Sequence, residues 1–471
     1  MKKLFILFLI AGAVYACNQM QDDSLDTSFQ PSFKVYFCDS GGNQLCSHLP
    51  IDLDTNFNAR QGYESFLDSV RQPPLDLFSW QTFVALNWPS NDAGQPIGSS
   101  IGDHPGAMRV WEHYRDPASV FNGSSGLLGE TIQPLLIHLG NAGRDKKKFF
   151  YMDSKSPKAL DTVTGFEEAD GHPLIDRNLN FAVYEIRLNH VEDTFITNNK
   201  LTTKAGIVAY SNANGFTLPI GDSSTGNPGA IEVKAAWRIL DPSKGDDTTR
   251  YYCRDAVIYV DSLSNVTGKT MLVNAKVGLV GMHIIRKTTT FSDKLIWSTF
   301  EHIDNTPDNP QEAQMNYGRL WSFYNPFCLN CVPNDTPVFQ PGDNGHYRWD
   351  SVPPYAASYA VTAPSQPDST YGTHVVRTYP IYKYTEQMNN IWRAKLKGTV
   401  WANYRLVGTQ WQGGENYPPT NAPALLANTT LETYIQPTAT CIGCHGNAGI
   451  TVGKSSTVRT DFSFLFPVYA K

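Results

Sequence analysis

The feature that most constrains this chain is the stretch TATCIGCHGNAG at residues 438–449. It contains two cysteines separated by two residues and followed at once by a histidine. That histidine, His445, stands 26 residues before the end of the 471-residue chain, and none of the eight methionines follows it. Too few residues remain after the motif to build an independent domain around it, so the preceding chain has to supply its surroundings.

Cys-x-x-Cys-His is the attachment pattern of haem c. Each thiol adds across one vinyl group of the porphyrin, and two intervening residues let one helical turn span two neighbouring corners of the ring. The imidazole that follows is then placed to ligate the iron. The sequence therefore predicts one covalent haem c, with Cys441 and Cys444 as thioether links and His445 as axial ligand of the iron. Gly443 and Gly446 leave room for close approach of the backbone to the ring.

Other interpretations of the motif fit less well. A thioredoxin-like Cys-x-x-Cys begins a helix after a strand of a βαβ unit, and no such unit surrounds residue 441. A zinc site needs further Cys or His ligands, and none follows in the last 26 residues. A small cytochrome c domain begins with the motif and supplies a methionine downstream, and a four-helix cytochrome lacks a β-rich middle. We therefore expect no stand-alone cytochrome c domain.

A sixth iron ligand, where one exists, has to come from upstream of the motif. Met282 and His283 are neighbours in a strand-like run, so they point to opposite faces of a sheet. His302 lies on a strand face with apolar neighbours that could receive one side of a haem. Met388 is the fourth candidate. Each also has an ordinary interpretation as a core or hydrogen-bonded residue, and an open sixth position is the remaining alternative.

The first residues predict export. Lys2 and Lys3 precede the apolar run LFILFLIAGAVYA, and Ala16 stands just before Cys17. This is the pattern of a signal peptide over residues 1–16, and the run is too short to cross a bilayer. The stretch VYAC resembles a bacterial lipobox, which implies cleavage before Cys17 and acylation of that residue, a stable membrane anchor. A plain secretory peptide is the alternative.

Residues 17–31 are polar and acidic without apolar periodicity, so we expect a flexible tether. The acidic pair close to Cys17 resembles a surface-export signal of lipoproteins. It favours the outer face of the outer membrane, with the cell envelope's periplasmic face as the alternative. The formal net charge of −6 gives no basic field, so nucleic acid is not an expected partner.

The remaining cysteines need an explanation because the predicted compartment is oxidising. Cys38 and Cys46 bracket a short glycine-containing loop, and we expect a disulfide between them. Cys328 and Cys331 in PFCLNCVP are expected to form a small loop disulfide, with a redox pair or a zinc site as alternatives. Cys253 would then be a buried thiol.

The chain's periodicity predicts an α+β fold in which a β-rich antiparallel sheet or sandwich forms the core and helices lie around it. Strands are expected at 230–240, 250–260, 271–288, 294–304 and 399–411, and helices at 63–88, 385–397 and over PALLANTTLETYIQ before the motif. The third and fourth of these strands are expected to form an antiparallel hairpin. We expect one large domain over 32–425, with the haem attachment segment 426–471 integral to it and packed on it.

Several phrases of the chain, DLFSWQTFVALNWP, LIWSTFEHID, RLVGTQW and LANTTLETYIQ with CIGCH and DFSFLF, resemble an uncharacterised family of exported bacterial mono-haem cytochrome c proteins. The resemblance supports Cys441, Cys444 and His445 as haem residues and implies no substrate.

Three functions follow as hypotheses. The first is a lipid-anchored mono-haem c-type cytochrome that transfers single electrons to redox partner proteins at the cell envelope. The second is a haem-dependent oxidoreductase for peroxide or another small molecule, with an open sixth site. The third is an aromatic-rich surface binding protein with a structural haem.

Overall fold

The computed structural model describes residues 45–53, 68–122, 148–152, 168, 170–260, 262, 265–290, 295–308, 319–326, 331–337, 361–363, 366–412, 421–453 and 456–471. The expected signal peptide and tether lie outside the described residues, and so do Cys17, Cys38 and Cys328. Within the described ranges, no helix combines the length and the apolar character that a bilayer crossing demands.

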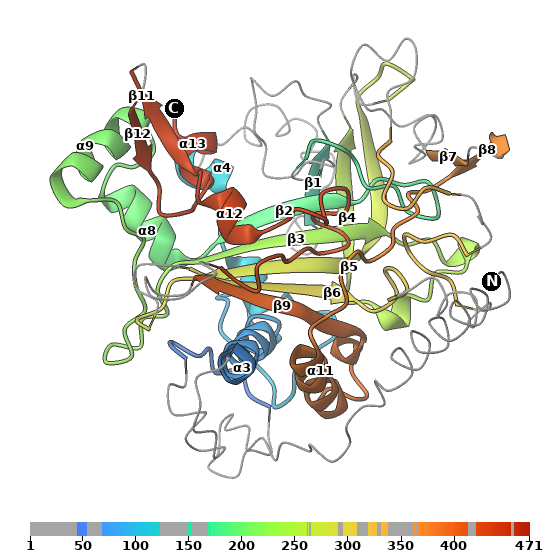
Figure 1. Ribbon diagram of the computed structural model, residues 1–471, viewed down its shortest axis with the longest axis horizontal. Helices are drawn as coiled ribbons and strands as arrows, with labels where there is room; N and C mark the ends of the chain where they lie inside the picture. Colours follow the sequence, from blue (N-terminus) through green and yellow to red (C-terminus); the bar gives the residue numbers. More distant parts are fainter. Residues whose placement is uncertain are drawn as a thin grey trace, which may run out of the picture.

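A mostly antiparallel sheet lies at the centre of the molecule (Figure 1). Its longest strand, β5 (Met271–Arg286), pairs through its first half with β4 (Cys253–Val260). Through its second half β5 pairs with both β3 (Ile231–Ile239) and β6 (Ile296–His302). These four strands are the ones expected from the runs rich in Val, Ile, Tyr and Trp, and β5 and β6 form the predicted antiparallel hairpin.

Four further strands extend this sheet. β9 (Tyr404–Gln412) pairs with β6 and leads to the short β10 (Asn421–Ala422). β2 (Val183–Leu188) pairs with β3, and β1 (Lys148–Met152) runs parallel to β4. The predicted strand at 399–411 is therefore confirmed from Tyr404 on, after a 3₁₀ turn over Val400–Asn403.

The mixed α/β class with an antiparallel sheet is confirmed, and the described residues form one large sheet rather than two facing ones. Two small two-stranded sheets accompany it, namely β7 (Val361–Ala363) with β8 (Gln366–Tyr371), and β11 (Gly449–Val452) with β12 (Ser456–Arg459). The other described 3₁₀ turns are Val110–His113, Pro242–Lys244 and Thr248–Arg250.

One face of the large sheet is covered by α3 (Asp68–Leu86) and α11 (Lys383–Lys395), both predicted as helices (Figure 1). The indole of Trp80 on α3 stacks on Trp392 of α11, with ring centroids 5.5 Å apart. Phe83 stacks on Phe300 of β6 at 4.2 Å. This aromatic layer is the main core, because its rings are almost completely buried.

Residues 426–453 and 456–471 lie on the opposite face of the sheet. They include α12 (Cys441–His445), the β11–β12 hairpin and α13 (Leu465–Tyr469). Asp461 accepts hydrogen bonds from the fully buried ammonium of Lys287, at the end of β5, at 2.7 and 2.9 Å. The segment is therefore fixed to the sheet by a buried ion pair as well as by apolar packing.

Three helices at one end of the sheet complete the packing around α13. They are α4 (Pro117–Asn122), α8 (His190–Asn198) and α9 (Lys204–Asn214). Phe466 of α13 is fully buried, and its ring lies edge-on to Phe121 and Phe216. The last residue, Lys471, exchanges backbone hydrogen bonds with Thr202 and Lys204.

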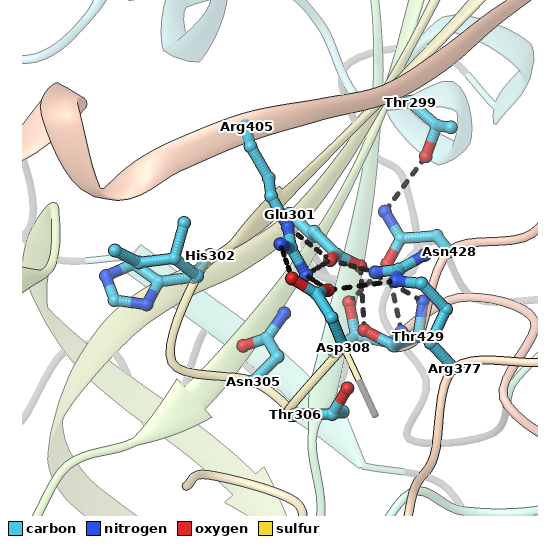
Figure 2. Close-up of polar contacts among 12 residues, drawn as sticks. Thr299, Glu301, His302, Asn305, Thr306, Asp308, Arg377, Arg405, Asn428 and Thr429 are labelled. Carbon is cyan, nitrogen blue, oxygen red and sulfur yellow. Dashed lines mark hydrogen bonds and ion pairs between the residues drawn. The ribbon is translucent and has the colours of Figure 1, made fainter. Parts of the chain in front are cut away.

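A buried ion-pair network joins β6 and β9 to Arg377 and to Thr429 at the start of the C-terminal segment (Figure 2). Glu301 accepts hydrogen bonds from Arg377, from Nε of Arg405 at 3.0 Å and from the hydroxyl of Thr429 at 2.8 Å. Burial alone would raise the pKa of Glu301, but the charges of Arg377 and Arg405 lower it below its ordinary value. Arg405 also pairs with Asp308.

The helix predicted over residues 423–436 is wrong: the chain there forms hydrogen-bonded turns. Asn428 accepts hydrogen bonds from the backbone N–H and the hydroxyl of Thr430, and its amide donates to Phe300 of β6. Thr433 donates to Glu168 at 2.6 Å. Asn and Thr side chains can form hydrogen bonds with nearby backbone groups that compete with helix formation. The prediction considered the spacing of the apolar residues and did not take these bonds into account.

Of the remaining cysteines the structure describes Cys46, Cys331 and Cys253, and Cys253 is half-buried rather than buried as expected. Cys46 and Cys331 are each disulfide-bonded, while their expected partners lie outside the described residues. Cys253 is a free thiol. It donates to the carbonyl of Thr248 at 3.3 Å, and burial raises its pKa to about 11, so it stays protonated and unreactive.

Candidate functional site

The Cys-x-x-Cys-His motif forms the single-turn helix α12, and side chains from two places hold its start. Thr440 is the N-cap, and its hydroxyl accepts a hydrogen bond from the N–H of Gly443. Gln410 on β9 accepts from the N–H of Ile442 at 2.9 Å and donates to the carbonyl of Pro423 at 2.7 Å. The sheet thus fixes the position of the motif directly.

A side chain at position 443 would clash with Thr440, the N-cap residue of α12. A Cβ at this position would lie 2.4 Å from the Thr440 methyl carbon, and one at Gly446 would lie 2.9 Å from the carbonyl oxygen of Ile442. The glycines therefore permit the tight turn of α12 itself. This is a different reason from the close approach to a ring that the sequence suggested.

His445 is oriented by a backbone carbonyl. Its Nδ1 lies 2.8 Å from the carbonyl oxygen of Phe462, and because a carbonyl can only accept, Nδ1 carries the proton. The ring lies between Trp297 of β6 and Phe464, with centroids 4.3 and 5.1 Å away. Burial lowers its pKa to about 4. At neutral pH the imidazole is therefore uncharged, and its Nε2 lone pair is available to a metal.

The two cysteines of the motif are free thiols. Cys444 is exposed and Cys441 is half-buried. Burial raises the pKa of Cys441 well above its ordinary value, and the charge of Glu432 adds to this. Redox-active Cys-x-x-Cys motifs lower the pKa of the attacking cysteine, so the surroundings of Cys441 do not match those of a thioredoxin-like motif.

Cys441, Cys444 and His445 line one cavity of about 140 Å³ between α12 and the sheet. The sheet contributes Lys234 and Glu232 from β3 and His283 from β5, and the turns before α12 contribute Glu432. Trp297, Ile285 and Leu465 give the cavity apolar walls. The three motif residues therefore meet polar and charged side chains from distant parts of the chain.

Of the four candidate sixth ligands, the structure brings His283 alone to this cavity. Its Nε2 lies 2.8 Å from a carboxylate oxygen of Glu432, which lines the same cavity. Burial raises the pKa of Glu432, but the charge and the hydrogen bond of His283 lower it overall. A carboxylate that bonds one ring nitrogen fixes the orientation of a histidine.

The other three candidates are core residues. Met282 points to the opposite face of the sheet, as predicted, where its sulfur accepts a hydrogen bond from Asn87 at 3.7 Å. Met388 is fully buried in the same core. His302 stacks on Tyr251 at 4.0 Å and bonds the carbonyl of Arg250. The apolar wall that His302 shares with Phe300 is covered by α3, because Phe83 stacks on Phe300.

The residues present fit a covalently attached haem. Two free thiols, a neutral imidazole with a free Nε2 and apolar walls share one cavity. The cavity is smaller than the roughly 300–1,000 Å³ of pockets that enclose a drug-sized ligand. It can therefore receive only part of a haem, and the exposure of Cys444 is consistent with a ring that also meets solvent.

Several residues of this site were not expected from the sequence. Gln410, Glu432 and the carbonyl of Phe462 position the motif or its neighbours, yet none belongs to a recognisable pattern. For the zinc alternative, the described residues contain no group of three or more His, Cys, Asp or Glu side chains able to hold a metal ion.

A second cavity of about 340 Å³ adjoins the first, since Leu426 lines both. Its walls include Trp411, Tyr379 and Tyr382, and the two tyrosines are among the exposed large side chains of the described surface. An aromatic groove far from the motif would favour the third hypothesis, whereas this one lies beside the motif.

Comparisons with protein-family models, with curated proteins and with solved structures found no match to this chain.

Proposed function

We propose that this chain is a mono-haem c-type cytochrome, anchored through a lipid on Cys17, that passes single electrons to partner proteins at the cell envelope. Cys441 and Cys444 would hold the haem through thioethers, and His445 would ligate its iron. The haem supplies one-electron redox chemistry when bound. The observation that carries the proposal is the hydrogen bond from Nδ1 of His445 to the carbonyl of Phe462, at 2.8 Å.

This hydrogen bond matters because a ligating histidine needs one nitrogen free and the other held. Metal-bound histidines donate their second N–H to a carbonyl or carboxylate, which fixes the ring and the tautomer. In this chain the arrangement already exists in the polypeptide. The Trp297 and Phe464 rings restrict the imidazole further, so the ligand is pre-organised.

His283 is the proposed sixth ligand, because it alone among the four candidates lines the cavity with the motif. If His283 and His445 both bound the iron, no coordination position would be left for a substrate, which would favour electron transfer. The neighbouring Glu432 would keep the ring of His283 in place.

The second candidate is a haem-dependent oxidoreductase with an open sixth site. The same His283–Glu432 pair favours it, because a histidine held by a carboxylate beside an open site can donate or accept a proton. The two functions differ in whether His283 binds the iron or stands free of it.

The experiment is maturation in a host that attaches haem c, followed by extraction with acidified organic solvent. Colour should remain with the wild-type chain and be lost from the double variant Cys441→Ser, Cys444→Ser. The matched control is Cys253→Ser, which removes a free thiol outside the cavity and should retain the colour. Wild-type protein that loses its colour on extraction would refute the covalent attachment.

A further inference from the structure

Two buried carboxyl groups stand at the wall of the motif cavity, and the proposed function leaves them unused. Glu232 on β3 lines the cavity and is 6% exposed. Glu192, in the first turn of α8, is fully buried, and it lies beside β3 because the side chain of Asn189, the N-cap of α8, accepts hydrogen bonds from the N–H groups of both Glu192 and Ile231. The pair therefore joins the cavity to the α8 side of the molecule.

The pair lacks hydrogen-bond donors for its buried oxygens. Both carboxyl oxygens of Glu192 and one of Glu232 are buried without a hydrogen-bond partner. Two ionised carboxylates offer only acceptors, and like charges in a buried site cannot both persist. A proton shared within the pair supplies the missing donor and removes one charge.

The charged groups around the pair do not neutralise it. Asp461 faces both glutamates and adds negative charge. Lys287 forms an ion pair with Asp461. Ser463 bonds Glu232, which partly opposes the effect of burial, and Lys234 lines the cavity from the same strand. Burial raises the pKa of Glu192 and of Glu232, and the negative charge of Glu232 raises that of Glu192 further.

We propose that Glu192 and Glu232 form a proton-binding site coupled to the redox state of the cavity: the pair, which already shares one proton, takes up a second proton from solvent when a one-electron donor reduces the protein, and releases this second proton on oxidation. The inference rests on the proposed function. One electron and one proton enter together, so the charge of the region is unchanged. The coupling is reciprocal, because each added charge changes the affinity for the other by the same factor.

The experiment is a potentiometric titration of the haem-loaded full chain, with the donor an electrode and the pH varied from about 5 to about 9. Raising the pH should lower the reduction potential. Over the whole pH range, the affinity for the electron should fall by at least about threefold. The largest possible effect for a one-electron couple is tenfold, or 59 mV, per pH unit. Glu232→Gln and Glu192→Gln should each flatten this dependence.

The matched control is Asp76→Asn. Asp76 is also a fully buried carboxyl whose pKa burial raises, to about 6, but it lies on α3 at the opposite face of the sheet. Its replacement should leave the pH dependence as in the wild type. Proton uptake on reduction, measured in weakly buffered solution, should fall in the two glutamate variants and not in the control.

The outcomes separate the two claims. A coloured wild-type protein whose potential does not vary with pH, or glutamate variants that keep the full dependence, would overturn the proton-binding site alone. Colourless protein would overturn the proposed function and this inference together. If one glutamate variant fails to fold, the pH dependence of the other variant tests the proton-binding site in the same way.

Discussion

The Nε2 atom of His283 lies 2.8 Å from a carboxylate oxygen of Glu432, and both side chains line the cavity that contains Cys441, Cys444 and His445. His283 comes from the middle of the sheet, and Glu432 comes from the turns that precede the motif. The folded chain thus places a histidine held by a carboxylate beside a histidine held by a carbonyl. This arrangement decides how the proposed haem would behave.

Replacing His283 should change the spin state of the iron. The wild-type protein is expected to give a low-spin absorption spectrum that cyanide and carbon monoxide leave unaltered, because both axial positions are taken. His283→Ala should give a high-spin spectrum that either ligand shifts. His190→Ala, which removes an exposed histidine outside the cavity, is the control and should retain the wild-type spectrum.

A high-spin wild-type spectrum that cyanide shifts would contradict ligation by His283. It would instead support the oxidoreductase, in which the His283–Glu432 pair faces an open position.

Gln410→Leu should loosen α12 from the sheet. The substitution leaves the N–H of Ile442 and the carbonyl of Pro423 without their partner. Each unsatisfied buried group costs about 1–3 kcal/mol, so for these two groups we expect a loss of roughly 2–6 kcal/mol in the free energy of unfolding. Hydrogen exchange of the α12 amides should accelerate. Unchanged exchange at Ile442 would show that Gln410 does not anchor the motif.

Asp461→Asn tests the attachment of the C-terminal segment. The change leaves the fully buried ammonium of Lys287 without a counter-charge, which costs about 3–5 kcal/mol. Asn tolerates the positive φ of 49° at this position, so the backbone is not disturbed. Urea unfolding measures the effect.

The matched control for this pair is Asp255→Asn, because Asp255 forms an exposed ion pair with Lys276. Exposed pairs contribute at most about 1 kcal/mol. Equal losses in the two variants would mean that the Lys287–Asp461 pair contributes no more than a surface contact.

Glu168 should make stability depend on pH. Burial raises the pKa of Glu168 from 4.5 to about 8, partly opposed by hydrogen bonds from Thr433. A carboxyl group whose pKa is raised by folding contributes to the stability of the folded state. This contribution is fully present at pH values below the pKa of the unfolded chain, and it is lost as the pH rises through the pKa of the folded state. Stability should therefore fall between about pH 4.5 and about pH 8.

The variant Glu168→Gln isolates this contribution. It should be more stable than the wild type near pH 8, by on the order of 2–4 kcal/mol, and should show less decline with pH. Chemical unfolding at several pH values is the measurement. Identical pH profiles would mean that Glu168 is not the group responsible.

The sheet was predictable because its strands are strongly patterned. β3, β4, β5 and β6 are long runs of β-branched and aromatic residues, and α3 and α11 carry apolar residues at helical spacing. The turns at 423–436 were not predictable in this way. Their conformation depends on side chains of Asn428 and Thr433 that bond residues distant in sequence.

The candidate site was predictable only in part. The motif identified Cys441, Cys444 and His445, since their spacing carries the chemistry. Strand alternation separated Met282 from His283 correctly, but the sequence could not show which face α3 covers. Which candidate reaches the cavity is decided by long-range packing.

The most direct test of the central claim is the intact mass of the mature protein from a host that attaches haem c. The proposed function predicts the mass of the processed polypeptide with its lipid on Cys17 plus one haem, with the haem mass located by peptide mapping on the fragment that contains Cys441 and Cys444. A mass that lacks the haem, in a colourless protein, would contradict it.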